Sequence, residues 1–159
     1  MHLPRLSRFL PSLPLAIAML ALASCASGPH KDVFPPRASI QQLTVQADGS
    51  WKLQVRMQNF SGVSMTFAKV EAKVEVAGNP AGDMSLSPAL RIGPESADIA
   101  EIDLKPSSAA AQAVQALKGA GSVRYKLSGR IVTTDPPSDQ PYTFEGFLSP
   151  VPGLTGVLR

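Results

Sequence analysis

The sequence predicts an all-β protein, a seven-stranded antiparallel β-sandwich with one short helix before the sixth strand. Several short segments alternate apolar and polar residues, which is the pattern of strands with one buried and one solvated face. Turn-forming residues separate these segments, and the chain contains 12 glycines and 15 prolines. No strand pattern is long and continuously apolar, so a parallel sheet is disfavoured. These observations together indicate two packed antiparallel sheets.

The strand boundaries follow from the alternation and from the turns. Strands are expected over residues 39–47, 51–58, 65–77, a short stretch from 84, 98–105, 123–133 and 142–148. Turns are expected at Asp48-Gly49 and over residues 59–62, 78–82, 93–96 and 135–139. Pro88 is expected to confine the strand from residue 84 to a sheet edge.

Two of these strands carry a detailed prediction. Segment 51–58 alternates most regularly, and its buried face is expected to hold Trp51, Leu53, Val55 and Met57. In segment 65–77 the parity of the apolar residues changes near Ala68 and Lys69, which predicts a bulge or bend.

A helix is predicted over residues 109–118, because this segment is rich in alanine and follows Ser107 or Ser108 as a candidate N-cap. Gly119 and Gly121 are expected to end it. One stripe of this helix holds Ala110, Ala113, Val114 and Leu117. Since its polar face is thin, we expect the helix to lie against the sandwich.

Residues 1–24 have the order of a secretory signal peptide. Arg5 and Arg8 form a basic start, residues 9–22 are almost wholly apolar, and small residues follow. The apolar run is shorter than the roughly 20 residues that a membrane-spanning helix needs. We therefore expect this leader to be removed.

Leu22, Ala23, Ser24 and Cys25 resemble the lipobox of bacterial lipoproteins, in which a branched apolar residue and two small residues precede cysteine. The resemblance implies that Cys25 receives a diacylglycerol, that the chain is cut before it, and that the new amino group is acylated, for example with palmitate. Two acyl chains suffice for stable anchoring. The alternative is a free or buried thiol in an ordinary secreted protein. In well-studied Gram-negative lipoproteins that are held at the inner membrane, an aspartate follows the cysteine. This chain has Ala26 at that position, so the resemblance favours the outer membrane, periplasmic face.

The mature chain would have 135 of the 159 residues, which suits one domain. We divide it into a polar tether over residues 25–37, the sandwich over 38–149 and a Pro- and Gly-punctuated tail over 150–159, expected to be partly mobile. Of the 15 Lys and Arg, 13 remain after the leader, against 12 Asp and Glu. This near-neutral balance argues against nucleic acid as a partner.

The candidate site residues are few. Arg124, Lys126 and Arg130 form a basic row that is a candidate phosphate or headgroup contact, although a solvated sheet face is the commoner explanation. Glu71 and Glu75 are interleaved with lysines and are expected to be solvated. The acids Glu95, Asp98, Glu101 and Asp103 match no calcium-loop spacing, and alternation would send Asp98 and Glu101 to opposite faces.

Catalytic chemistry has little support in the sequence. The mature chain offers one histidine, His30 in the tether, and one cysteine, so triads, Cys-His pairs and zinc sites lack domain-borne members. Gly119-Ala120-Gly121 follows a helix and precedes a strand, which is the reverse of a phosphate-binding loop. We expect a protein that is not an enzyme and has no cofactor or metal.

Residues 40–148 resemble the type 2 late embryogenesis abundant (LEA) family, also called the WHy (water stress and hypersensitive response) domain. The resemblance rests on the order of several elements: Val55-Arg56-Met57-Gln58-Asn59-Phe60, residues 70–76 with the Gly78 turn, the alanine-rich helix, and the segments YKLSGRI at 125–131 and YTFEGFL at 142–148. Phe60 stands where the family usually has proline. The resemblance implies a fibronectin type III or immunoglobulin-like sandwich linked to desiccation or stress tolerance, often in a lipoprotein, without catalytic residues.

The leading hypothesis is therefore a non-catalytic lipoprotein that faces the periplasm and supports envelope integrity in a stress response. Two alternatives stay open. One is a carrier of lipid or another hydrophobic ligand, suggested by the helix beside the sheet and by apolar residues such as Phe147 and Leu154. The other is an accessory subunit of an envelope complex. The membrane, through the lipid anchor, is the expected partner in each case.

Overall fold

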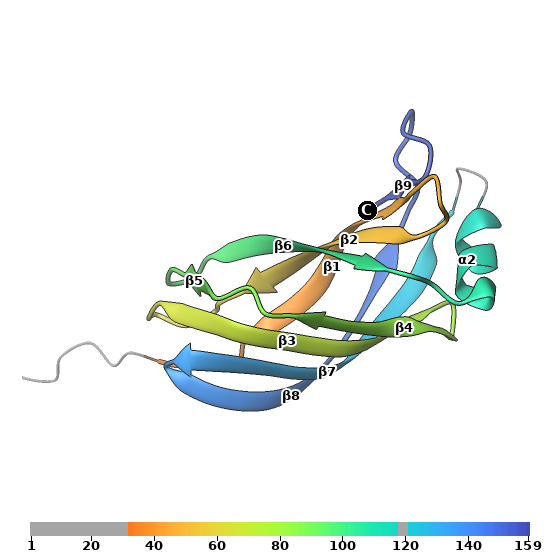
Figure 1. The fold of residues 1–159 in the computed structure, drawn as a ribbon. Helices are drawn as coiled ribbons and strands as arrows, with labels where there is room; N and C mark the ends of the chain where they lie inside the picture. The colour runs from red at the N-terminus through yellow and green to blue at the C-terminus, as the bar shows by residue number, and fades with distance from the viewer. Residues whose placement is uncertain (1–31, 118–120) are drawn as a thin grey trace, which may run out of the picture. The chain divides into compact units, whose positions relative to one another are not determined.

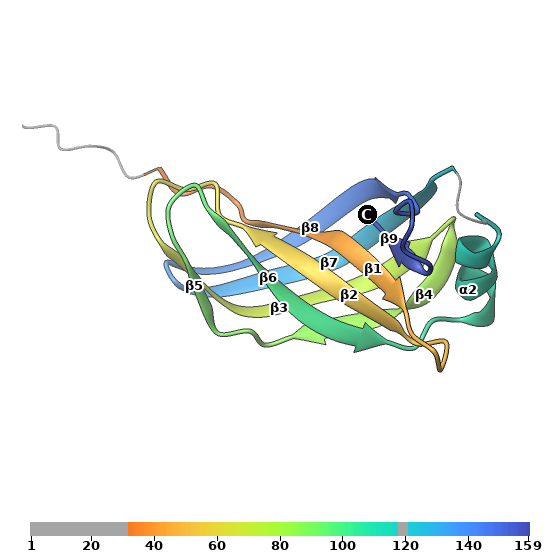
Figure 2. The same ribbon diagram turned by 90° about the horizontal axis from the view of Figure 1, so that it is seen from above.

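The computed structural model describes residues 32–117 and 121–159, which form one compact unit, Asp32–Arg159. The predicted signal peptide, Cys25 and His30 lie outside the described residues. Within them, two antiparallel sheets pack face to face, as Figures 1 and 2 show from two directions. The all-β sandwich is confirmed.

The first sheet has the strand order β6-β2-β1-β9, and the second has the order β4-β3-β7-β8 with β5 paired to β3. The strands are β1 (Arg37–Val45), β2 (Trp51–Gln58), β3 (Met65–Val76), β4 (Asn79–Leu86), β5 (Leu90–Ile92), β6 (Ala97–Leu104), β7 (Val123–Asp135), β8 (Pro137–Leu148) and β9 (Val157–Leu158). The described residues thus contain nine strands, and the predicted count of seven is wrong. The two additional strands, β5 and β9, have only three and two residues. Segments this short cannot display a clear alternation.

The hairpin from β1 to β2 forms where the sequence predicts it. Gly49 has a φ of 83°, which glycine adopts without steric cost, and the Asp48 carboxylate accepts a hydrogen bond from the Ser50 backbone N–H at 2.9 Å. The four predicted core residues of β2 are all buried: Trp51, Leu53, Val55 and Met57. The strand predicted over residues 39–47 ends earlier, at Val45, and Ala47 is exposed.

The predicted irregularity in β3 is confirmed. Register shifts in the β3–β7 pairing fall between Thr66 and Phe67 and between Phe67 and Lys69. As a result Met65 and Phe67 are buried before the shift, and the residues of opposite parity from Val70 to Val76 are buried after it. A bulge inserts one residue and so restores an inward direction to both apolar sets.

Two expected turns are largely strand. β4 begins at Asn79, so the turn before it is confined to Ala77 and Gly78, and β8 begins at Pro137. Both strands contain proline, which sequence rules read as turn punctuation. However, β4 and β8 are the two edges of their sheet, where a missing N–H can face away from the ladder.

Helix α2 (Ser108–Gln115) follows Ser107, one of the two predicted N-caps, whose hydroxyl accepts a hydrogen bond from the Ala110 N–H at 3.3 Å. The helix ends at Gln115, before the predicted end at residue 118. The same hydroxyl donates to the Pro80 carbonyl of β4 at 2.6 Å, which fixes the start of the helix on the sheet. The helix buries Ala110 and Val114. Among the described residues, no helix is long and apolar enough to cross a membrane.

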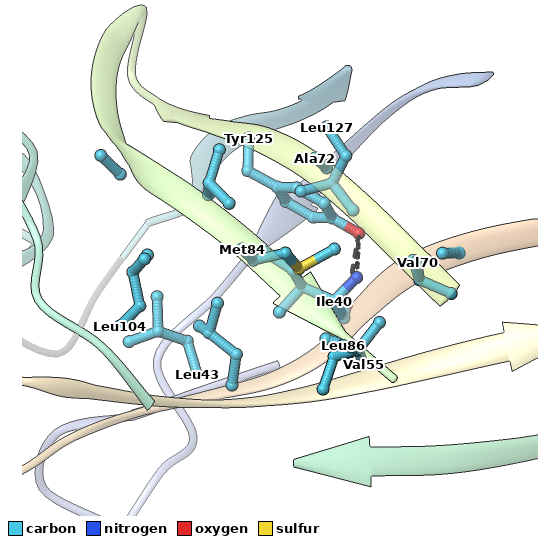
Figure 3. Close-up of a cluster of buried hydrophobic side chains, with 14 of the residues drawn as sticks. Ile40, Leu43, Val55, Val70, Ala72, Met84, Leu86, Leu104, Tyr125 and Leu127 are labelled. Carbon is cyan, nitrogen blue, oxygen red and sulfur yellow. Dashed lines mark hydrogen bonds between the residues drawn. The ribbon is translucent and has the colours of Figure 1, made fainter. Parts of the chain in front are cut away.

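The side chains between the sheets form one buried cluster (Figure 3). The largest members with almost no exposed area are Trp51, Phe67, Leu43, Leu53, Met57, Met65, Met84, Leu127, Ile131 and Leu148. Tyr125 of β7 crosses this core, and its hydroxyl accepts from the Ile40 N–H at 3.1 Å and donates to the Ile40 carbonyl at 3.2 Å. Since β9 pairs only with Leu43 and Thr44, the tyrosine hydroxyl takes the place of a strand partner at Ile40.

Candidate functional site

The lipobox, Leu22 to Cys25, lies outside the described residues, so its lipidation stays a prediction. The three candidate residues of the basic row lie within them, on the solvent face of β7. The charged residues of β3 and β8 lie on the same solvent face of the second sheet. This solvent face is one of three surfaces with a candidate binding role.

The basic row is closely matched by acids of β8. Arg124 forms an ion pair with Glu145, and Lys126 lies opposite Glu145 in the strand register. The Arg130 Nε donates to the Asp139 Oδ1 at 2.8 Å, and this hydrogen bond raises the pKa of Arg130 above its ordinary value. A phosphate would therefore have to displace a carboxylate from either arginine.

The neighbouring strand β3 continues this mixed-charge face. Its lysines pair with acids, Lys69 with Glu71 at 2.6 Å and Lys73 with Asp83 of β4 at 3.6 Å. A hollow of about 650 Å³ lies on this face and is lined by Glu71, Ala72, Lys73, Asp83, Met84, Ser85, Ser128, Gly129, Arg130 and Pro141. Of the predicted basic row, the hollow thus includes only Arg130. Charges of both signs surround it, so it selects no particular charge on a ligand.

The acidic residues of β6 do not converge. The Glu101 side chain accepts from the Gln54 amide at 3.1 Å and lies 3.8 Å from the Lys52 ammonium, while Asp98 accepts from the Ile99 N–H at 2.8 Å. Across residues 32–117 and 121–159, no group of three or more His, Cys, Asp or Glu side chains is arranged to hold a metal ion.

The third surface is an apolar groove between α2 and the C-terminal segment, which we call the α2 groove. Its volume is about 520 Å³, within the range of small-molecule sites. The lining residues are Val45, Val114, Gln115, Leu117, Pro150, Val151, Pro152, Gly153, Leu154, Thr155, Gly156, Val157 and Leu158. None of them is charged. The groove therefore suits an apolar chain better than a polar ligand.

The C-terminal segment that forms one wall of this groove is held by backbone hydrogen bonds. Ser149 and Arg159 exchange two of them, at 2.6 and 2.9 Å, and the Val151 N–H donates to the Val157 carbonyl at 2.9 Å. The Val45 N–H donates to the Gly156 carbonyl at 2.8 Å, which joins the segment to β1. The residues expected to be a tail thus return to the sheet.

The α2 groove contains Leu154 and the helix residues Val114 and Leu117, which the sequence had already singled out. Leu154 lines it and is 52% exposed, whereas Phe147 of β8 is not among the lining residues and is 67% exposed. The rest of the groove was missed, because Pro150 to Gly156 show no periodicity from which a wall could be predicted.

Comparisons with solved structures give likenesses at low identity. A solution structure of a protein from Arabidopsis thaliana has a TM-score of 0.47 and 12% identity, covering 77% of this chain and 83% of that one. A crystal structure of a protein from Archaeoglobus fulgidus has a TM-score of 0.41 and 13% identity, covering 76% and 98%. A solution structure of a protein described as late embryogenesis abundant (LEA) has a TM-score of 0.44 and 13% identity, covering 84% and 79%.

No family model and no curated protein matches the sequence.

Proposed function

We propose that the protein is a lipid-anchored, non-catalytic protein of the bacterial envelope, whose LEA type 2-like sandwich supports envelope integrity under drying or other stress. The observation that carries this proposal is the sequence Leu22-Ala23-Ser24-Cys25 after an apolar leader. Acylation of Cys25 would hold the domain at the membrane without a spanning segment, because two acyl chains give stable anchoring.

The chemistry of the described domain is consistent with a non-catalytic role. Its buried polar side chains hold the backbone of loops: the Asn59 amide donates to the Gly93 carbonyl at 2.9 Å, the Ser61 hydroxyl accepts from the Phe34 N–H at 2.8 Å, and the Thr133 hydroxyl donates to the Pro136 carbonyl at 2.6 Å. On the second sheet Lys69, Lys73, Arg124 and Arg130 form ion pairs with acids. These charged groups therefore pair with one another on a solvated surface.

Metabolic labelling with a palmitate analogue tests the anchor. Cys25 is the only cysteine of the chain, so Cys25→Ser removes the single acceptor thiol. The wild type should take up the label and Cys25→Ser should not. An unlabelled wild type, or label that persists in the variant, would contradict the anchor.

A deletion strain tests the role in the envelope. We expect it to survive drying, osmotic shock and detergent less well than the wild type, and expression of the wild-type protein should restore survival. Complementation with Cys25→Ser separates the anchor from the domain, since rescue by this variant would show that anchoring is dispensable. Equal survival of the deletion strain under all three stresses would refute the role.

The α2 groove favours a second candidate function, the binding of a lipid or another apolar ligand. Native mass spectrometry of protein purified from membranes should then show a bound apolar molecule in addition to the covalent lipid. Leu154→Ser should reduce its occupancy, while Phe147→Ser, which alters an exposed apolar residue outside the groove, should not. Ligand-free protein, or equal loss in both variants, would exclude the groove as the binding site.

A further inference from the structure

Two adjacent apolar residues, Val33 and Phe34, are 54% and 50% exposed just before β1 begins. Both fall in the segment expected to be a polar tether, where their apolar character was the signal that sequence reasoning missed. Figure 2 shows that the chain enters β1 at the end of the sandwich opposite α2. We call this the N-terminal end of the sandwich, formed by residues 32–36 with the loops 59–64 and 93–96.

The backbone that carries these two side chains is held in place. The Phe34 N–H donates to the Ser61 hydroxyl at 2.8 Å, and that hydroxyl donates to the Phe34 carbonyl at 3.2 Å. The Gly62 N–H donates to the Asp32 carbonyl at 3.2 Å. Residues 32–34 therefore lie against the loop 59–64 as a short extended strand would, although Val33 and Phe34 remain half exposed.

This loop is in turn fixed by Asn59, whose side chain has no exposed area. Its amide nitrogen donates to three carbonyls, those of Val63 at 2.8 Å, Ile92 at 3.2 Å and Gly93 at 2.9 Å. Its amide oxygen accepts from the Ser61 N–H at 2.9 Å. A continuous network thus connects the core to Phe34, so the apolar pair is presented on an ordered support.

The charges around the pair have both signs. Asp32 and Glu95 both make backbone contacts to the loop 59–64, and the Arg37 guanidinium lies 5.0 Å from the centre of the Phe60 ring. These residues create no basic surplus that would attract anionic lipid. A partner that binds the N-terminal end of the sandwich would therefore be held by apolar contacts.

We propose that Val33 and Phe34 insert into the interface of the lipid bilayer and seat the N-terminal end of the sandwich on the membrane. This inference rests on the proposed anchor at Cys25. Cys25 precedes Val33 by eight residues, so the chain between them spans at most about 29 Å. Confinement near the surface raises the effective concentration of the pair at the bilayer, which allows even a small apolar contact to be populated. The α2 groove would then face away from the attachment point.

Tryptophan quenching in lipid vesicles tests the contact. Full-length, lipidated protein is reconstituted into vesicles of phosphatidylcholine with brominated acyl chains, and Phe34→Trp is compared with the wild type. The wild type supplies the blank, because its single tryptophan, Trp51, is 1% exposed in the core. Phe147→Trp is the matched control, since Phe147 is an exposed aromatic residue at the end of β8, where Leu148 pairs with Val123, the first residue of β7 after α2.

The emission added by Phe34→Trp should be quenched about twofold or more and shifted to the blue, because interfacial insertion places a side chain about 5–10 Å into the headgroup and acyl boundary. The emission added by Phe147→Trp should not change. Quenching should also be independent of salt and of anionic lipid. Each variant is first checked for wild-type circular dichroism, so that a folding defect is not taken for a change of contact.

Detergent phase partition of the wild type separates this inference from the proposed function. Protein that stays in the aqueous phase would refute the anchor itself. Protein that partitions with detergent, while the emissions added by Phe34→Trp and by Phe147→Trp are equally unquenched in vesicles, would leave the anchor intact and overturn the contact. Self-association through Val33 and Phe34 in place of quenching would also overturn it.

Discussion

The hydrogen bonds between Tyr125 and Ile40 make Tyr125→Phe the most informative single substitution in the core. The change removes one oxygen atom and keeps the ring, which is 3% exposed and packs against Phe144 at a centroid distance of 5.9 Å. The apolar contacts of the ring should therefore persist. What is lost is the partner of the Ile40 N–H and carbonyl groups, both of which are buried.

The expected cost follows from these two groups. A buried donor or acceptor left without a partner costs about 1–3 kcal/mol, so the loss of two partners in Tyr125→Phe should lower the free energy of unfolding by about 2–6 kcal/mol. For the 128 residues from Asp32 to Arg159, an unfolding entropy of about 2.1 cal/mol/K per residue converts this to a fall in Tm of about 7–22 °C.

Tyr142→Phe is the control for this experiment. The Tyr142 hydroxyl is also buried, but within the described part of the chain it has no hydrogen-bond partner. Burial raises the pKa of Tyr142 well above its ordinary value. Removal of this hydroxyl should leave stability unchanged or raise it by about 1 kcal/mol.

Urea denaturation followed by Trp51 fluorescence measures both variants, since Trp51 moves from the core to water on unfolding. The midpoint of Tyr125→Phe should fall with an unchanged slope, and that of Tyr142→Phe should not fall. Equal midpoints for wild type and Tyr125→Phe would refute the role of the Tyr125 hydroxyl as a substitute strand partner. Equal losses in the two variants would show that ring packing, not hydrogen bonding, is responsible.

Three further predictions use the same measurement. Gly129→Ala should destabilise the domain by about 3 kcal/mol, because an added Cβ would lie 1.8 Å from the Glu71 carbonyl oxygen. Gly62→Ala is the control and should change stability little, since the space around Gly62 is open. Equal losses of stability in the two variants would contradict the steric explanation. Asn59→Ala should cost about 2–4 kcal/mol because three carbonyls lose their donor, and a loss below about 1 kcal/mol would show that water replaces the amide. Burial raises the pKa of Tyr125 from 10.0 to about 12, so the folded state favours the neutral phenol. The contribution of this phenol to the free energy of unfolding should be intact below about pH 10 and lost as the pH rises through about 12. Tyr125→Phe should therefore lose less stability at alkaline pH than the wild type.

Local patterns predicted the strands because burial acts on alternate residues. The β2 face of Trp51 to Met57 and the parity change in β3 were readable from neighbouring residues alone, since each side chain has only two directions in a strand. Ser107 was similarly readable as a cap, because capping involves backbone groups within one helical turn. Prediction was poorer where a residue's meaning depends on its place in the sheet, as for Pro80 and Pro137.

The candidate sites divide in the same way. The basic row was visible as Arg124, Lys126 and Arg130, but its acids on β8 lie 9 to 21 residues away in sequence and are assigned only by the strand register. The α2 groove forms only because the C-terminal segment returns to β1, and no local sequence pattern predicts that return. The ordered support of Phe34 depends on Ser61, 27 residues later.

The sequence by itself determined the class of fold, the faces of its regular strands, the helix cap and the predicted address at Cys25, because each depends on residues within a few positions of one another. Only the tertiary structure decided which strands meet, and with them the bonds from Tyr125 to Ile40 across 85 residues, the ion pairs of the basic row and the exposed support for Val33 and Phe34. Pairings over such separations are selected by the burial of the whole core, so no segment contains the information to specify them alone.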